Sequence, residues 1–278
     1  MASLLALSAA LAYGAGDFLG GVASRRAPTT AVVLWSHIVG LIVLVAAVPI
    51  VGGELTPQAL AVGAGAGIVG ALGVTLFYQG LSIGSMSVVA PVAGLLSAAL
   101  PVAAGFGAGE RPGAVAVAGI ALALVAITLV SRETAPGESP GRHRIQALAL
   151  AAGAGISFGL FFTMLNTADE GAGIWPLVGA RMASVTLFTL LGIAKVTQAA
   201  PPRTAAAAAM GAGVLDAAAN VFYVLALTHG LLSVVSVLTA LYPAGTVLLA
   251  RYGLGERMSS VQRTGLAVAG FSALLIAV

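Results

Sequence analysis

GAGER at residues 107–111 returns as GLGER at residues 253–257, which is 146 positions further along the chain. The triplet SVV shows the same spacing, since it occurs at residues 87–89 and again at 233–235. Similarity that recurs at one fixed offset is the mark of an internal repeat. These two pairs of segments therefore predict a molecule that consists of two related halves.

The composition places both halves in a membrane. Of the 278 residues, 59% are hydrophobic and only 8% are charged, and the mean hydropathy is +1.07. Soluble domains carry about 25% charged residues, so this chain has too few charges to cover a particle of its size in water. The sequence therefore predicts an all-α integral membrane protein with many spans.

Ten apolar segments are long enough to cross a bilayer, which takes about 20 residues. They cover residues 2–23, 29–51, 58–82, 86–107, 113–131, 145–166, 173–196, 204–228, 231–252 and 259–278. We expect one five-helix repeat over 1–131, a hydrophilic linker over 132–144 and a second repeat over 145–278. Because five is odd, the second repeat must enter the membrane from the opposite side, as in many secondary transporters.

Motifs near the end of each half resemble those of a known family. GAGER (107–111), GLGER (253–257) and LYP at 241–243 are similar to elements of the EamA branch of the drug/metabolite transporter superfamily. The resemblance extends over essentially the whole chain and implies ten helices and the export or exchange of small organic solutes. Two positions depart from the family pattern: Ser97 replaces the proline of the second half, and Glu54 stands where many relatives are basic.

The basic residues indicate which face is cytoplasmic. Ten of the twelve lysines and arginines fall in connections, or in helix ends beside them, that share one face: Arg25, Arg26, Arg132, Arg142, Arg144, Lys195, Arg203, Arg251, Arg257 and Arg263. The positive-inside rule places this face in the cytoplasm and both termini outside a cell (inner or plasma) membrane. Many relatives are described with cytoplasmic termini instead, so the two lines of reasoning leave the orientation open.

Four ionisable residues lie within the predicted spans, namely Asp17, His37, Arg181 and Asp216. An Asp or Arg at the centre of a span costs roughly 2.5–3.5 kcal/mol on insertion scales. We therefore expect each of the four to face protein or water rather than lipid, and each is a candidate for the functional site.

Asp216 begins a polar stripe, because Asn220 and Tyr223 follow at i+4 and i+7 on the same helix face. The stripe could line an aqueous pocket that binds the solute. Alternatively, Asp216 pairs with a polar group on a neighbouring helix and only fixes the packing. Tyr13 and Asp17 form a similar pair in the first span.

Weaker candidates for solute binding lie in other spans. Tyr78 and Gln79 belong to span 58–82, the repeat mate of the span that carries Asp216. Trp35, Asn166, Trp175 and Tyr242 are secondary candidates, and Trp175 is better explained as an aromatic anchor at the membrane interface.

His37 and Arg181 each allow more than one interpretation. Asp17 lies roughly 12 Å below the interface marked by Arg25, and His37 lies at a similar depth. If Asp17 and His37 meet, they form either a proton-coupling element, since histidine changes charge near neutral pH, or a hydrogen bond that keeps two helices in register. Arg181 either binds an anionic group of the solute, pairs with Asp216, or reaches the surface.

Prolines point to interrupted helices. Pro91, Pro101 and Pro243 are expected to break or kink the spans 86–107 and 231–252. A broken helix within a membrane is tolerated where it lines a cavity. We therefore expect a pocket between the halves, lined by the first, third, fourth, sixth, eighth and ninth spans.

The remaining features limit the function. Cysteine is absent, which excludes disulfides and thiol chemistry, and no motif predicts a metal, a cofactor or nucleic acid binding. The leading hypothesis is a secondary transporter, acting by alternating access, with Asp17, His37 and Asp216 in proton coupling. Its partners would be a small-molecule substrate and the lipid bilayer, and it would act as a monomer or homodimer. The alternatives are an intramembrane enzyme that uses Ser157 or His37, and a non-transporting scaffold.

Overall fold

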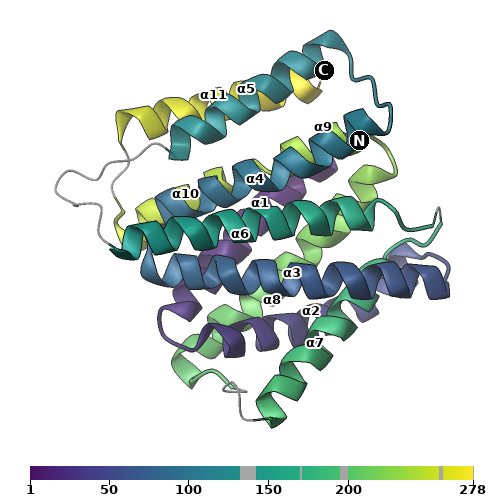
Figure 1. The fold of residues 1–278 in the computed structure, drawn as a ribbon, viewed down its shortest axis with the longest axis vertical. Coiled ribbons are helices and arrows are strands. Elements are labelled where there is room, and N and C mark those ends of the chain that lie inside the picture. Colours follow the sequence, from purple (N-terminus) through teal and green to yellow (C-terminus); the bar gives the residue numbers. More distant parts are fainter. Residues whose placement is uncertain (132–141, 170, 195–199, 257–258, 278) are drawn as a thin grey trace.

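The computed structural model describes residues 1–131, 142–169, 171–194, 200–256 and 259–277. Within these ranges every regular element is an α-helix (Figure 1). The helices are α1 (Ala2–Ser24), α2 (Thr29–Val51), α3 (Pro57–Ile83), α4 (Met86–Gly107), α5 (Ala114–Ser131), α6 (Arg142–Leu165), α7 (Trp175–Ile193), α8 (Arg203–Leu227), α9 (Leu232–Thr239), α10 (Pro243–Leu254) and α11 (Ser260–Ala277). The linker predicted at 132–144 falls largely outside the described residues.

The helices have the length and polarity of membrane spans. In the described part of the chain, eight segments are long and apolar enough to cross a bilayer, one of which is α9 and α10 taken together, and α5 and α11 are shorter apolar helices. Large apolar side chains such as Leu11, Ile42 and Leu274 are exposed on the outer surface. A water-soluble protein would bury most of these side chains, whereas lipid solvates them. The predicted ten-helix membrane fold is confirmed.

The main contacts between a helix of the first half and a helix of the second half have counterparts in which the two halves change roles. α1 packs on α8 as α6 packs on α3, and α1 packs on α9 and α10 as α6 packs on α4. Likewise α3 lies against α7, and α8 lies against α2. The helices α5 and α11 pack on each other along one side of the bundle, at the top of Figure 1. This matching is what an internal repeat predicts. The opposite threading of the halves through a membrane remains a prediction.

Two glycines show the repeat at atomic detail. A Cβ on Gly67 of α3 would collide with the backbone of Ala180 in α7. A Cβ on Gly213 of α8 would collide with the backbone of Ser36 in α2. The two glycines are 146 positions apart, the same offset that separates the GAGER and GLGER motifs. The small residue therefore permits the same close approach of two helices in each half.

In the described part of the chain, only the second half has a predicted span that is divided into two helices. The ninth predicted span divides into α9 and α10 around residues 240–242, and Pro243 is the first residue of α10, so the break predicted there is confirmed. The fourth span is not broken, because α4 continues through Pro91 and Pro101, and the kink that was the alternative to a break stays a prediction. Ser97, which occupies the repeat position of Pro243, retains the backbone N–H that a continuous helix needs.

The chain reversals gather at the two ends of the bundle (Figure 1). We call one end the Arg25 face; it includes residues 25–28, 84–85 and 255–256. We call the other end the Glu110 face; it includes residues 52–56, 108–113, 166–169 and 228–231. Both termini lie at the Glu110 face (Figure 1), as an even number of spans requires.

Candidate functional site

A cavity with about 40 Å³ of space accessible to water lies in the interior of the bundle. Residues from both halves line it: Tyr13 and Asp17 of α1, Gly70, Val74 and Tyr78 of α3, Phe158, Phe161 and Phe162 of α6, Arg181 of α7, Asp216 and Asn220 of α8, and Tyr242 at the α9–α10 junction. A cavity shared by both halves can be opened or closed by their relative movement.

The charges in the cavity are arranged around Arg181. Its guanidinium makes an ion pair with the carboxylate of Asp216, and the side chain of Asn220 donates to the same carboxylate at 3.2 Å. Arg181 is only 7% exposed. A guanidinium so far from water needs a countercharge. Of the roles predicted for Arg181, the structure therefore contains the pairing with Asp216.

Asp17 is the second carboxylate of the cavity and has no such partner. Among the described residues, no basic side chain lies within ion-pair distance of Asp17 and no hydrogen bond reaches its carboxylate. Tyr13, Tyr78 and Tyr242 share the cavity wall with it. Because Asp216 is paired with Arg181, Asp17 is the carboxylate of the cavity that has no basic partner among the described residues.

Aromatic rings form most of the remaining wall. Tyr13 packs edge-on against Phe162 and Tyr242, with ring centroids 6.0 and 6.3 Å apart. The hydroxyl of Tyr13 and the side-chain oxygen of Asn220 are buried and have no hydrogen-bond partner among the described residues. Buried polar atoms are normally satisfied, so a solute that separates the surrounding side chains would meet two polar atoms in need of a partner.

Seven of the predicted site residues are brought together in this cavity: Tyr13, Asp17, Tyr78, Arg181, Asp216, Asn220 and the secondary candidate Tyr242. The predicted contribution of the fourth span is wrong, because no described residue of α4 lines the cavity, whereas α7 contributes Arg181.

His37 has a different partner from the one we expected. Its Nδ1 lies 2.9 Å from the hydroxyl of Ser184 on α7, and its ring meets Phe188 edge-on. No hydrogen bond or ion pair joins His37 to Asp17, although both residues are described. The reason is that α2 packs mainly on α7 and α8 rather than along α1. The predicted pairing of Asp17 with His37 is therefore wrong.

Gln79 and Tyr223 also lie outside the cavity lining. The side-chain oxygen of Gln79 accepts a hydrogen bond from Thr29 at 3.0 Å, near the Arg25 face. Tyr223 is fully buried behind Phe162, with ring centroids 4.5 Å apart, and its hydroxyl lies 3.0 Å from that of Ser236 on α9. Both side chains join neighbouring helices and do not face the cavity.

Sequence reasoning missed the phenylalanines of α6. Phe158, Phe161 and Phe162 all line the cavity. Their i, i+3, i+4 spacing places them on one helix face, and this was the signal that could have identified them. Ser157, the candidate nucleophile of the enzyme hypothesis, instead donates its hydroxyl to the carbonyl of Gly153 at 2.9 Å.

Comparisons with known proteins agree with this architecture. A family model described as the EamA-like transporter family matches residues 1–132 and 145–278. No curated protein matches the chain. A solved structure, described only as a crystal structure of a protein, aligns with a TM-score of 0.76 over 100% of this chain and 98% of its own at 17% identity. At that identity the likeness shows the fold alone.

Proposed function

The chain belongs to the EamA-like transporter family, and from this premise we propose that it is a secondary active transporter that works by alternating access. Membership makes it a multi-pass membrane transporter of small solutes. The finer proposal is that it exports or exchanges an amine-bearing metabolite, such as an amino acid, across the cell membrane as a monomer or homodimer.

The position of the cavity supports alternating access. α1 and α3 supply one part of its wall, and α6, α7 and α8 supply the other. If the two repeats are threaded oppositely, rocking one against the other opens the cavity to each side of the membrane in turn. The closely packed glycine seams between the halves allow helices to slide with little steric obstruction.

The charge balance of the cavity is the observation that carries the choice of solute. Arg181 neutralises Asp216, which leaves the carboxylate of Asp17 for a solute amine or a proton. The other groups that face Asp17 are the phenols of Tyr13, Tyr78 and Tyr242. Their rings, with those of α6, offer negative π-faces to a cation. A proton and an amine would compete for Asp17, and this competition would couple solute export to proton entry.

A matched series of solutes tests the proposal. Phenethylamine, phenylalanine and phenylpropionate share an aromatic body and differ in charge. We expect phenethylamine or phenylalanine, but not phenylpropionate, to stabilise the purified protein thermally and to move across proteoliposomes in response to a pH gradient. Asp17→Asn should abolish the acceleration by the pH gradient and also slow solute counterflow, because the amine loses its countercharge.

Two results would contradict the proposal. Transport restricted to phenylpropionate would show that the excess carboxylate does not select the solute. Unchanged pH-driven transport in Asp17→Asn would show that this carboxylate does not couple protons to solute movement. The variant Gln79→Leu is a suitable control, because Gln79 lies outside the cavity lining.

A further inference from the structure

The glutamates of GAGER and GLGER bind the start of a helix in the opposite half. The carboxylate of Glu110 accepts hydrogen bonds from the backbone N–H groups of Leu232 and Ser233, at 2.7 and 3.0 Å. These residues are the first two of α9. A carboxylate at a helix N-terminus satisfies N–H groups that have no partner within the helix and complements the helix dipole.

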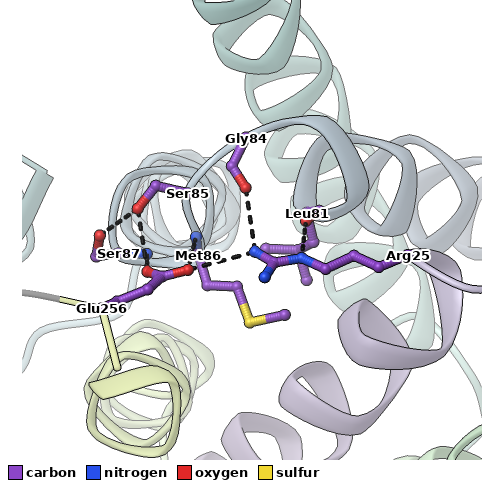
Figure 2. A network of polar contacts seen from close by, with 7 residues as sticks. All are labelled: Arg25, Leu81, Gly84, Ser85, Met86, Ser87 and Glu256. Carbon is purple, nitrogen blue, oxygen red and sulfur yellow. Dashed lines mark hydrogen bonds and ion pairs between the residues drawn. The ribbon is translucent and has the colours of Figure 1, made fainter. Parts of the chain in front are cut away.

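Glu256 repeats the arrangement at the other end of the molecule. Its carboxylate accepts from the backbone N–H groups of Met86 and Ser87, at 3.3 and 3.1 Å, and from the hydroxyl of Ser85 (Figure 2). Met86 and Ser87 begin α4. Glu256, Met86 and Ser87 each lie 146 positions from their counterparts Glu110, Leu232 and Ser233. Each half therefore caps a helix of the other half, once at each face. We call these two contacts the Glu110 clasp and the Glu256 clasp.

Among the described residues, the carboxylate of Glu256 is paired with a cation and that of Glu110 is not. The guanidinium of Arg25 lies 3.3 Å from the carboxylate of Glu256 (Figure 2). No described basic side chain pairs with the carboxylate of Glu110, since the neighbouring Arg111 donates to its backbone carbonyl at 2.9 Å. At the repeat offset of 145, the sequence position equivalent to Arg25 is occupied by Glu170. The sequence itself therefore differs between the two halves at the position of Arg25.

Arg25 ties several chain segments together at its face. Besides Glu256, it donates to the carbonyls of Leu81 and Gly84 at the end of α3, at 3.2 and 3.4 Å (Figure 2). It thereby links the end of α1 to the end of α3 and, through Glu256, to the start of α4. A movement that opens the cavity at this face must separate some of these segments.

The bridge also connects to the wall of the cavity. Asp17 lies eight residues before Arg25 on α1, which is roughly 12 Å along the helix axis. Between them, Gly20 packs so closely on the ring of Tyr78 that a Cβ there would overlap it. Tyr78 lines the cavity. A displacement at the Arg25 end of α1 would therefore be transmitted to two cavity residues.

We propose that Arg25 is a positioning residue that holds the Arg25 face closed, and that its bridge to Glu256 breaks when this face opens. The two glutamate caps remain in place in both states, and the bridge made by Arg25 is the contact that breaks. The side chain of Arg25 is 32% exposed, so water can replace its partners. This inference rests on the alternating access proposed above.

The natural absence of cysteine makes the inference testable by labelling. Val74→Cys places a single thiol in the cavity wall, and a membrane-impermeant maleimide is added to one side at a time. Arg26→Cys, in a separate protein, identifies the side on which the Arg25 face lies. From that side, Arg25→Gln should raise the labelling rate of Val74→Cys by roughly fivefold, as expected for the loss of a partly exposed charged bridge.

Matched variants separate gating from general destabilisation. Arg25→Lys keeps the charge but loses the planar fork, so its labelling rate should lie between wild type and Arg25→Gln. Arg26→Gln should leave the rate unchanged, because the side chain of Arg26 contacts no partner among the described residues. Glu110→Gln should lower thermal stability without raising labelling from the Arg25 face.

The outcomes distinguish this inference from the proposed function. Unchanged labelling in both Arg25→Gln and Arg25→Lys would overturn it, even if solute transport is demonstrated. Equal acceleration by Glu110→Gln would also overturn it, since the effect would then reflect loosening of either clasp. Faster labelling in Arg25→Gln, combined with no movement of any solute in the charge series, would support the closure and refute the proposed solute class.

Discussion

Replacing Asp216 with asparagine leaves Arg181 charged and without its partner. The amide oxygen of asparagine can still accept from Asn220, so the substitution removes charge and little else. Removing one member of a buried ion pair typically costs 3–5 kcal/mol. The side chains of Arg181 and Asp216 are 9% and 21% exposed, which places the expected cost at the lower end, about 3 kcal/mol. A chain of this size should then unfold roughly 6–12 °C lower.

Thermal unfolding in detergent, followed by tryptophan fluorescence, measures this effect directly. The double variant Arg181→Met with Asp216→Asn should recover most of the loss, because no unpaired charge remains. Asp17 lines the same cavity and offers Arg181 a substitute partner, so Asp216→Asn should be more damaging when Asp17→Asn is also present. Two results would refute the reasoning. One is an unchanged melting temperature in Asp216→Asn. The other is a loss of stability in the double variant Asp17→Asn with Asp216→Asn that equals the sum of the two single losses.

Two further substitutions separate packing from solute binding. Gly14→Ala should destabilise the protein by about 1–3 kcal/mol, because the added Cβ would lie 2.6 Å from a backbone oxygen at the α9–α10 junction. Thermal unfolding measures this loss, and wild-type stability would contradict the close fit. Tyr223→Phe should cost about 1 kcal/mol through the lost bond to Ser236 and leave solute affinity unchanged in a binding titration; a large loss of affinity would place Tyr223 in the binding site after all.

The helix positions could be predicted closely from the sequence, because bilayer thickness fixes the length of each apolar run. The prediction 29–51 coincides with α2 (Thr29–Val51), and 204–228 differs by one residue at each end from α8 (Arg203–Leu227). The behaviour of prolines was less predictable. The same residue type interrupts the ninth span and is accommodated in α4, and nothing in the local sequence distinguished these two outcomes.

The charged part of the site was predictable for a different reason. An ionisable group within a span is so costly that few positions qualify, and Asp17, Arg181 and Asp216 all proved to line one cavity. His37 met the same criterion, but its partner Ser184 lies on a helix whose position no local pattern specifies. The phenylalanines of α6 were missed because aromatic residues are common on any helix face in lipid or in a core, so their presence carries little information.

The break at Pro243 has a local cause that a substitution can reverse. Proline has no N–H to donate to the carbonyl of Thr239, four residues earlier, and this carbonyl instead accepts from the N–H of Tyr242 at 3.1 Å. The tightened turn presents the backbone of Tyr242 to Gly14 of α1, and Thr246 donates its hydroxyl to the carbonyl of Gly14 at 3.1 Å.

Pro243→Ala restores the missing donor and should join α9 and α10 into one continuous helix. Since proline inside a helix costs about 3 kcal/mol relative to alanine, part of that energy should appear as a higher melting temperature. Continuous helical geometry would also turn Tyr242 away from its present place in the cavity wall, so we expect slower solute counterflow. A variant that is both less stable and fully active would show that the break is set by the packing of α1 and α4 around it, and that Pro243 merely fits a conformation imposed from outside.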